Sequence, residues 1–210
     1  MSQMLNTTTD EHALTADHVA APRWMGWVWL IAGGLAWLAA LVLIAENFAQ
    51  LQDKTPLINC DVSSTISCSP NFSTPAGNLL GIPNSVLGIA GFVIPMLAGA
   101  LALGGARLPR WFWRAFTAGI CGAMGLVLFF QYFTLTVSHV LCPNCEVVWC
   151  ATVPMFFATL GWSLESGIWG EGRRMRAAGS FFRAWWWVLA IAELLAMLLA
   201  SQLVFNVFGL

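Results

Sequence analysis

Charged side chains are scarce in this sequence. They make up 9% of the 210 residues, whereas hydrophobic residues make up 59% and the mean hydropathy is +0.74. Soluble domains carry roughly 25% charged residues, so this composition excludes an ordinary soluble domain and indicates a protein that lives in lipid. The formal net charge is −1, which gives no bulk electrostatic attraction for nucleic acid.

Metal ligands and motifs for prosthetic groups are also few. Of the three histidines, only His139 lies near cysteines in the sequence. Cys60 and Cys68 are separated by seven residues, whereas zinc-ligand pairs are typically separated by about two to four. No flavin or haem motif is present. We expect no metal site; zinc bound by the four cysteines of the polar loops is the alternative that this pattern leaves open.

Long apolar runs are the dominant feature. A membrane-spanning helix needs about twenty apolar residues. Five stretches meet this requirement, at residues 24–45, 79–103, 115–137, 147–164 and 184–208. Residues 1–23 are polar and lack apolar periodicity, so we predict a disordered cytoplasmic tail rather than a signal peptide. The expected fold is an all-α integral membrane protein, and its tryptophans are expected to favour the bilayer interface.

Basic residues predict the orientation of the spans. Eight of the nine lie before the first span or in the linkers 104–114 and 165–183, whereas the loop 46–78 has only Lys54 and the loop 138–146 has none. The positive-inside rule therefore places the amino terminus in the cytoplasm and both of these loops outside. The loop cysteines Cys60, Cys68, Cys142 and Cys145 are all predicted on the outer side. Direct exchange between them is therefore geometrically allowed.

A C-x-x-C pair stands where the fourth span begins, at Cys142-Pro143-Asn144-Cys145. Positions i and i+3 share one helix face, about 5–6 Å apart at Cβ, so a disulfide can form and break with little backbone movement. Pro143 suits the first helical turn, and the helix dipole favours thiolate. A redox pair is one interpretation; a structural disulfide is the other.

An electron relay between cysteines needs at least two cysteine pairs on the same side of the membrane, and this sequence is predicted to have them. Thiol–disulfide exchange passes electrons between pairs through a mixed disulfide. The wide spacing of Cys60 and Cys68 suits a flexible arm. A carrier dissolved in lipid, such as a quinone, can reach a dithiol at the start of a membrane helix. Cys121 and Cys150 lie inside spans and are predicted to pack as small apolar residues.

Four short motifs in this order resemble the vitamin K epoxide reductase family, specifically its bacterial disulfide-forming branch. They are Cys60-Asp61-Val62, Ile66-Ser67-Cys68-Ser69, Ile82-Pro83-Asn84-Ser85 with Gly88, and Leu141-Cys142-Pro143-Asn144-Cys145. The resemblance covers residues 24–164. It implies a four-helix bundle around a quinone site, with a fifth transmembrane helix.

The resemblance also implies roles for single residues. Cys145 is similar to the sulfur that reacts with the quinone, and Cys142 to its resolving partner. Cys68 is similar to the loop cysteine that bridges to Cys142, and Cys60 to the cysteine that meets the partner protein. Asn84 matches the position that hydrogen-bonds a quinone carbonyl.

The sequence departs from the family pattern in places. Trp149 stands where Tyr is frequent at the second carbonyl-binding position, and an indole donates one hydrogen bond but cannot relay a proton as a hydroxyl can. Thr74 stands where some members have Ser. The sequence shows no thioredoxin-like domain after the fifth span, so the expected partner is a separate periplasmic DsbA-like protein.

The hypothesis is a thiol oxidase of the bacterial inner membrane, with its active site on the extracytoplasmic side and menaquinone or ubiquinone as the acceptor. One alternative within the family is vitamin K epoxide reduction. A non-enzymatic alternative is a membrane structural protein stapled by two permanent disulfides.

Overall fold

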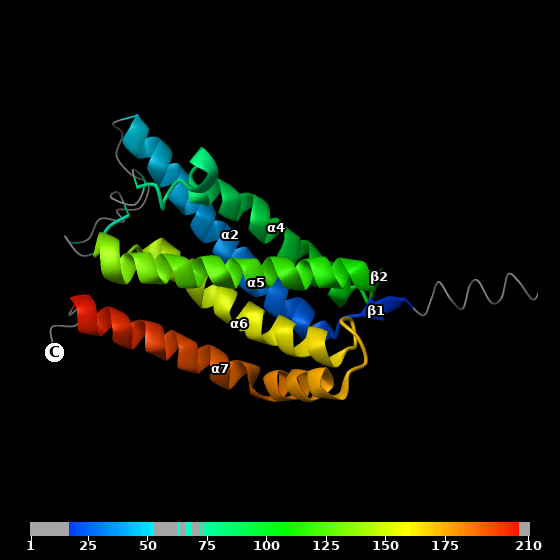
Figure 1. Cartoon of the computed structure of the whole chain (residues 1–210). Coiled ribbons are helices and arrows are strands. Elements are labelled where there is room, and N and C mark those ends of the chain that lie inside the picture. The colour runs from blue at the N-terminus through cyan, green and yellow to red at the C-terminus, as the bar shows by residue number, and fades with distance from the viewer. Residues whose placement is uncertain (1–16, 53–62, 64–65, 69–71, 73, 206–210) are drawn as a thin grey trace, which may run out of the picture.

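The computed structural model describes residues 17–52, 63, 66–68, 72 and 74–205. Within this part of the chain, five helices are long and apolar enough to cross a membrane. Their order along the chain follows the five predicted spans, and the expected all-α membrane fold is confirmed (Figure 1). The helices are α2 (Arg23–Leu51), α4 (Asn84–Leu103), α5 (Arg110–Phe133), α6 (Pro143–Glu165) and α7 (Arg173–Phe205).

Helix α6 is the centre of the bundle. It packs against α2, α5 and α7, whereas α4 packs mainly on α2. Of the most apolar stretch of each helix, 56% is buried in α6, compared with 33% in α2 and 11% in α7. The helix that begins at the C-x-x-C pair is therefore the one around which the others are arranged.

Tryptophans form much of the core. Trp29 of α2 and Trp113 of α5 are 0% exposed, and both rings contact Trp162 of α6. The indole Nε1 of Trp29 donates a hydrogen bond of 2.8 Å to Thr159 Oγ1, so its one polar atom is satisfied inside the bundle. These indoles therefore pack between helices rather than on the outer surface of the bundle.

The Trp29–Thr159 hydrogen bond gives a test of this packing. We expect Thr159→Val to lower the free energy of unfolding by about 1–3 kcal/mol, because it leaves a buried indole N–H unpaired. Thr152→Val is the matched control, since the buried Thr152 hydroxyl bonds only Val148 O of its own helix. Denaturant unfolding in detergent micelles measures both; equal losses for the two variants would contradict this account.

Helices α6 and α7 lie close together because two glycines meet at their crossing. A Cβ on Gly161 would lie 2.6 Å from the backbone N of Arg183, and a Cβ on Gly179 would collide with the backbone of Glu165. Small residues allow such close approach between membrane helices. Arg183 Nε also lies 3.1 Å from Glu165 Oε2 at this crossing. Close glycine packing and this ion pair therefore hold α7 against α6, although most of the surface of α7 is exposed.

The amino-terminal boundary corrects the prediction of a disordered tail through residue 23. Strand β1 (His18–Ala20) pairs antiparallel with β2 (Arg107–Pro109), and α2 begins at Arg23. The indole Nε1 of Trp113 donates to Val19 O at 2.9 Å, which adds a partner for the strand backbone. The pairing depends on residues almost ninety positions away, so local composition gave no sign of it. Residues 1–16 lie outside the described part of the chain.

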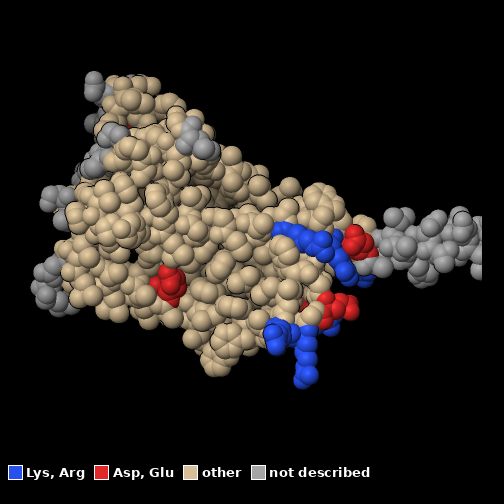
Figure 2. Space-filling view, viewed as in Figure 1, with Lys and Arg blue, Asp and Glu red and all other residues tan. Residues whose placement is uncertain are grey.

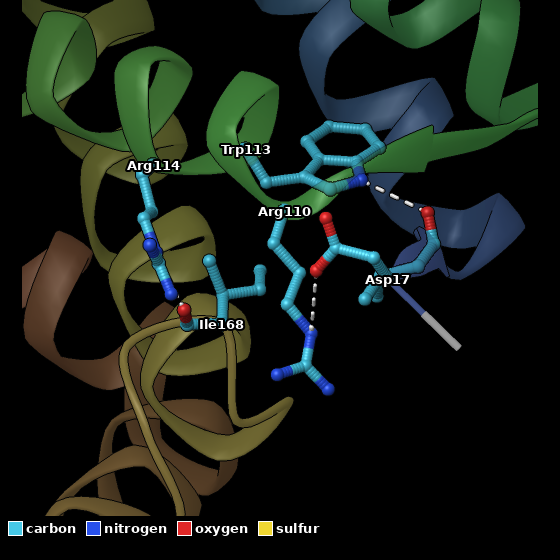
Figure 3. A network of polar contacts seen from close by, with 6 residues as sticks. Asp17, Arg110, Trp113, Arg114 and Ile168 are labelled. Atoms are coloured by element: carbon cyan, nitrogen blue, oxygen red, sulfur yellow. Dashed lines mark hydrogen bonds and ion pairs between the residues drawn. The ribbon is translucent and has the colours of Figure 1, made fainter. Parts of the chain in front are cut away.

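The same end of the bundle carries polar contacts between elements. Arg110 Nε lies 3.7 Å from Asp17 Oδ1, and Arg114 Nε donates to Ile168 O at 2.7 Å (Figure 3). The second contact ties α5 to the turn between α6 and α7. Charged side chains gather at this end in the view of Figure 2.

Helix boundaries differ from the predicted spans. Helix α7 begins at Arg173 rather than near residue 184, so the four arginines of the predicted linker are helical. Thirty-three residues make a helix of about 50 Å, longer than the roughly 30 Å hydrocarbon core. The arginine-bearing first turns therefore extend beyond the apolar span. Helix α2 likewise continues to Leu51, inside the predicted outer loop.

Candidate functional site

The C-x-x-C segment forms the first turn of α6. Cys142 is the N-cap residue in an extended conformation, and Pro143 is the first helical residue, where its missing N–H leaves no bond unmade. The N–H of Glu146 donates to Cys142 O at 3.1 Å and closes the turn. Cys142 is 4% exposed and Cys145 is half-buried, and both are free thiols.

Cys68 lies directly against this turn. Its Sγ is 3.3 Å from Cys142 Sγ, although the two residues are 74 positions apart. Cys68 is 1% exposed and is disulfide-bonded, whereas Cys142 is a free thiol. Cys60 itself lies outside the described residues. Sulfurs at this separation are within the range of reacting atoms held ready for attack, about 3–3.5 Å.

Main-chain pairing holds Cys68 in place. Ile66 and Leu141 form a parallel β-bridge, and the N–H of Ser67 donates to Leu141 O at 2.9 Å. Ser63 supports the bridge, because its Oγ accepts from Ile66 N at 3.1 Å and its N–H donates to Ile66 O at 3.0 Å. The loop that was predicted to be a flexible arm is therefore docked at this point, one residue before each of the two sulfurs.

The surroundings lower the pKa of the Cys142 thiol. The largest cause is a hydrogen bond with the Cys145 thiol, which stabilises the Cys142 thiolate. Burial raises the pKa of Cys142 and is the second-largest effect. The backbone N–H groups of Cys145 and Asn144 lower this pKa, and the negative charge of Glu146 raises it. Thiolate is the attacking form in thiol–disulfide exchange. Cys142 is therefore the sulfur of the pair prepared to attack Cys68, or to be regenerated by it.

Apolar side chains surround the sulfurs. Leu43 of α2 and Phe72 pack against the pair formed by Cys68 and Cys142. Cys145 contacts this pair and also a second cluster between α5, α6 and α7, which includes Trp149. The other buried members of that cluster are Met124, Val127, Val153, Ala190 and Met197. Cys145 thus lies between the loop sulfur and the apolar interior of the bundle.

The residues predicted to bind a quinone fall in two places. Trp149 is 5% exposed inside the α5–α6–α7 cluster. Asn84 is the first residue of α4, where its Oδ1 accepts from Leu79 N at 3.0 Å and its Nδ2 donates to Ala76 O at 2.6 Å. An amide group carries two N–H hydrogens, so Asn84 holds this turn and retains one donor.

Thr74 belongs to the same turn before α4. Its Oγ1 accepts from Gly77 N at 3.0 Å. The described contact of this side chain is therefore structural, and it shapes the loop from which Asn84 projects.

Sequence reasoning missed residues that build the site through the backbone. Asn78 donates from Nδ2 to Phe72 O at 2.6 Å and to Thr74 O at 3.0 Å, which fixes the segment carrying the Phe72 ring. A single Asn in a polar loop gives no signal of such a role.

A groove of about 530 Å³ lies on another side of α6. It is bounded by α2 residues from Trp27 to Leu35, by α6 residues from Glu146 to Pro154, and by Trp186 of α7. A helix turns about 100° per residue, which puts the groove-lining positions of α6 largely opposite Cys145 and Trp149. Glu146 lines it, whereas Cys142 and Cys145 do not.

Metal binding finds no support among the residues that the structure describes, where no group of three or more potential ligands could hold an ion. His139 ends the π-helical turn η2 (Thr134–Ser138) with φ of 52°, and its N–H donates to Thr134 O at 3.1 Å. Its described role is to close the turn before the C-x-x-C segment.

The structure thus combines an all-α multi-pass membrane fold with two adjoining cysteines at one end of the central helix. The sequence model of the vitamin K epoxide reductase family matches residues 27–160, more than half of the chain, and the chain belongs to that family. Members of the family are oxidoreductases, so this protein is an oxidoreductase of the multi-pass membrane type. A comparison with curated proteins gave no match.

Proposed function

We propose that this protein is a quinone-dependent thiol oxidase that supports disulfide formation outside the cytoplasm. The observation that carries the proposal is the 3.3 Å separation between Cys68 and Cys142, a loop sulfur against a helix-start sulfur. Family membership supplies the oxidoreductase class. The partner, the acceptor and the roles of single residues are part of the proposal.

The relay consists of two dithiol–disulfide exchanges, first from the partner to the loop pair and then from the loop pair to the Cys142–Cys145 pair. A reduced partner dithiol converts the Cys60–Cys68 disulfide to two thiols and leaves as a disulfide. Cys68 thiolate then attacks Cys142 of a Cys142–Cys145 disulfide, forming Cys68–Cys142 and releasing Cys145. Attack of Cys60 on Cys68 restores the loop disulfide and leaves Cys142 and Cys145 as thiols. Two electrons have then moved inward from the partner, and two protons are available for the acceptor.

The apolar setting of Cys145 supports a lipid-soluble acceptor. A quinone, when bound, accepts the two electrons and two protons. We propose that Trp149 provides a wall of its site, and that Asn84 offers its remaining amide hydrogen to a carbonyl oxygen while Thr74 shapes the supporting turn. The donor count of Asn84 fits this role, since only one of its two N–H groups is used by Ala76. The acceptor is menaquinone or ubiquinone.

The arrangement of charge supports an extracytoplasmic active site. Arg114 contacts the turn after α6, whereas Cys142 caps the opposite end of the same helix. Under the positive-inside rule the cysteine end then faces the outside, which in a bacterium is the periplasmic face of the inner membrane. A DsbA-like thioredoxin-fold protein is the proposed partner, and the family's bacterial disulfide-forming branch is the proposed subgroup.

The test of the function is turnover with purified protein. Full-length protein in detergent is mixed with a reduced DsbA-like protein and either ubiquinone-1 or a short-chain menaquinone, and quinone reduction is followed by absorbance. Partner disulfide and hydroquinone should appear in equal amounts. In a parallel assay that supplies dithiothreitol as the reductant, reduction of vitamin K epoxide by protein that reduces neither quinone would support the epoxide-reductase alternative. No turnover with the epoxide or with either quinone would support the structural one.

Asn84→Ala separates quinone use from disulfide chemistry. We expect its KM for quinone to rise about tenfold, because a hydrogen bond to the carbonyl is lost. Oxidation of the cysteines by a chemical oxidant such as diamide should be unchanged. Thr74→Ala is the comparison, since it disturbs the same turn without removing the proposed donor. Equal KM effects for the two variants would show that Asn84 acts only through loop structure.

A further inference from the structure

Asn144 lies between the two cysteines of the C-x-x-C segment and faces both sulfurs of the proposed exchange. Its Nδ2 lies 4.0 Å from Cys68 Sγ, at the outer limit of a hydrogen bond to sulfur. Its backbone N–H also contributes to the lowered pKa of the Cys142 thiol. One half-buried residue in the first turn of α6 thus reaches the loop sulfur with its side chain, while its backbone favours the thiolate of the helix sulfur.

Because Cys68 is buried among mostly apolar side chains, a hydrogen-bond donor such as the Asn144 amide would strongly affect a charge on its sulfur. Cys68 is 1% exposed, and its described packing neighbours are the apolar Leu43 and Phe72 and the thiols Cys142 and Cys145. Exchange places negative charge on this sulfur whenever it is the attacking or the leaving thiolate. A buried charge without hydrogen bonds is costly, and donors to a charged group contribute more than donors to a neutral one.

We propose that the Asn144 side chain stabilises the thiolate of Cys68 during exchange between the two cysteine pairs. This inference rests on the proposed function. In the step concerned, Cys68 thiolate attacks Cys142, the Cys68–Cys142 bond forms, the Cys142–Cys145 bond breaks, and the electron pair leaves on Cys145. No net oxidation occurs within the protein. As negative charge develops on Cys68, the side-chain amide of Asn144 moves closer to that sulfur. The backbone N–H of Asn144 continues to favour the thiolate of Cys142.

The experiment isolates this step from quinone reduction. Fully reduced, full-length protein in detergent is mixed with one equivalent of ubiquinone-1, then quenched with acid at successive times. Free thiols are alkylated, and mass spectrometry counts each disulfide. In the wild type, the Cys142–Cys145 disulfide should appear first and the Cys60–Cys68 disulfide later, as oxidising equivalents move to the loop.

Asn144→Ala should slow the second step about tenfold and leave the first unchanged, because the backbone donor to Cys142 remains. Asn144→Asp should slow it further, since a carboxylate of nearly the same shape opposes charge on Cys68. The first step serves as the control for folding. Wild-type kinetics of the second step in Asn144→Ala would overturn the proposal, and so would equal slowing of both steps. If the wild type forms no disulfide with quinone, it is the proposed function that fails.

Discussion

Cys145→Ser is expected to abolish quinone-coupled oxidation of a dithiol, reducing turnover to the rate without protein. A serine hydroxyl cannot form the inner disulfide, so the electrons that reach Cys142 have no exit. Cys145 is half-buried between the Cys68–Cys142 pair and the apolar cluster around Trp149, and no other described thiol shares that position. The assay is the absorbance change of ubiquinone-1 with reduced partner protein.

Cys150→Ser is the matched control for this variant. Cys150 is a free thiol on the same helix, but it is exposed and lines the groove on another side of α6. Its replacement should leave turnover unchanged. Full activity in Cys145→Ser, or equal loss in both variants, would reject the proposed route of the electrons.

Ser67→Pro is expected to reduce exchange between the two cysteine pairs about a hundredfold. Proline lacks the N–H that donates to Leu141 O at 2.9 Å, so the bridge that docks the loop loses its hydrogen bond. Cys68 follows immediately, and a displacement of about 1 Å between reacting atoms can cost about a hundredfold in rate. The acid-quench measurement of the Cys60–Cys68 disulfide gives the rate.

Ser67→Ala provides the comparison, because it removes the side chain and keeps the backbone donor. We expect it to slow exchange at least about tenfold less than Ser67→Pro does, since the hydrogen bond to Leu141 is made by the main chain. If the proline and alanine variants exchange equally fast, docking through Leu141 is not what brings the sulfurs together.

The helical fold was predictable because its signal is local. Twenty-residue apolar runs identify spans wherever they occur, and all five predicted spans correspond to helices. The β1–β2 pair was missed because its backbone bonds join residue 19 to residue 108, and neither sequence is strongly strand-like. The start of α7 was placed late because arginines ended the apolar run, although they do not end a helix.

Which cysteines could meet was easier to predict than how the chain holds them together. The C-x-x-C spacing and the positive-inside rule led to Cys68 and Cys142 on one side of the membrane, and the structure places their sulfurs 3.3 Å apart. The means of docking could not be foreseen, because Ser67 and Leu141 meet through backbone atoms that every residue has. Asn84 is hydrogen-bonded within the turn before α4, and Trp149 packs in the α5–α6–α7 cluster, so their roles in binding a quinone stay predictions.

The central claim is that Cys68 and Cys142 exchange a disulfide, and covalent trapping tests it most directly. In Cys145→Ser, thiolate at Cys142 can attack Cys68 and no inner thiol can resolve the product. The measurement is mass spectrometry of the alkylated, protease-digested protein after acid quenching. The account predicts a Cys68–Cys142 disulfide with alkylated Cys60; a Cys60–Cys68 disulfide alone, with Cys142 alkylated throughout, would contradict it.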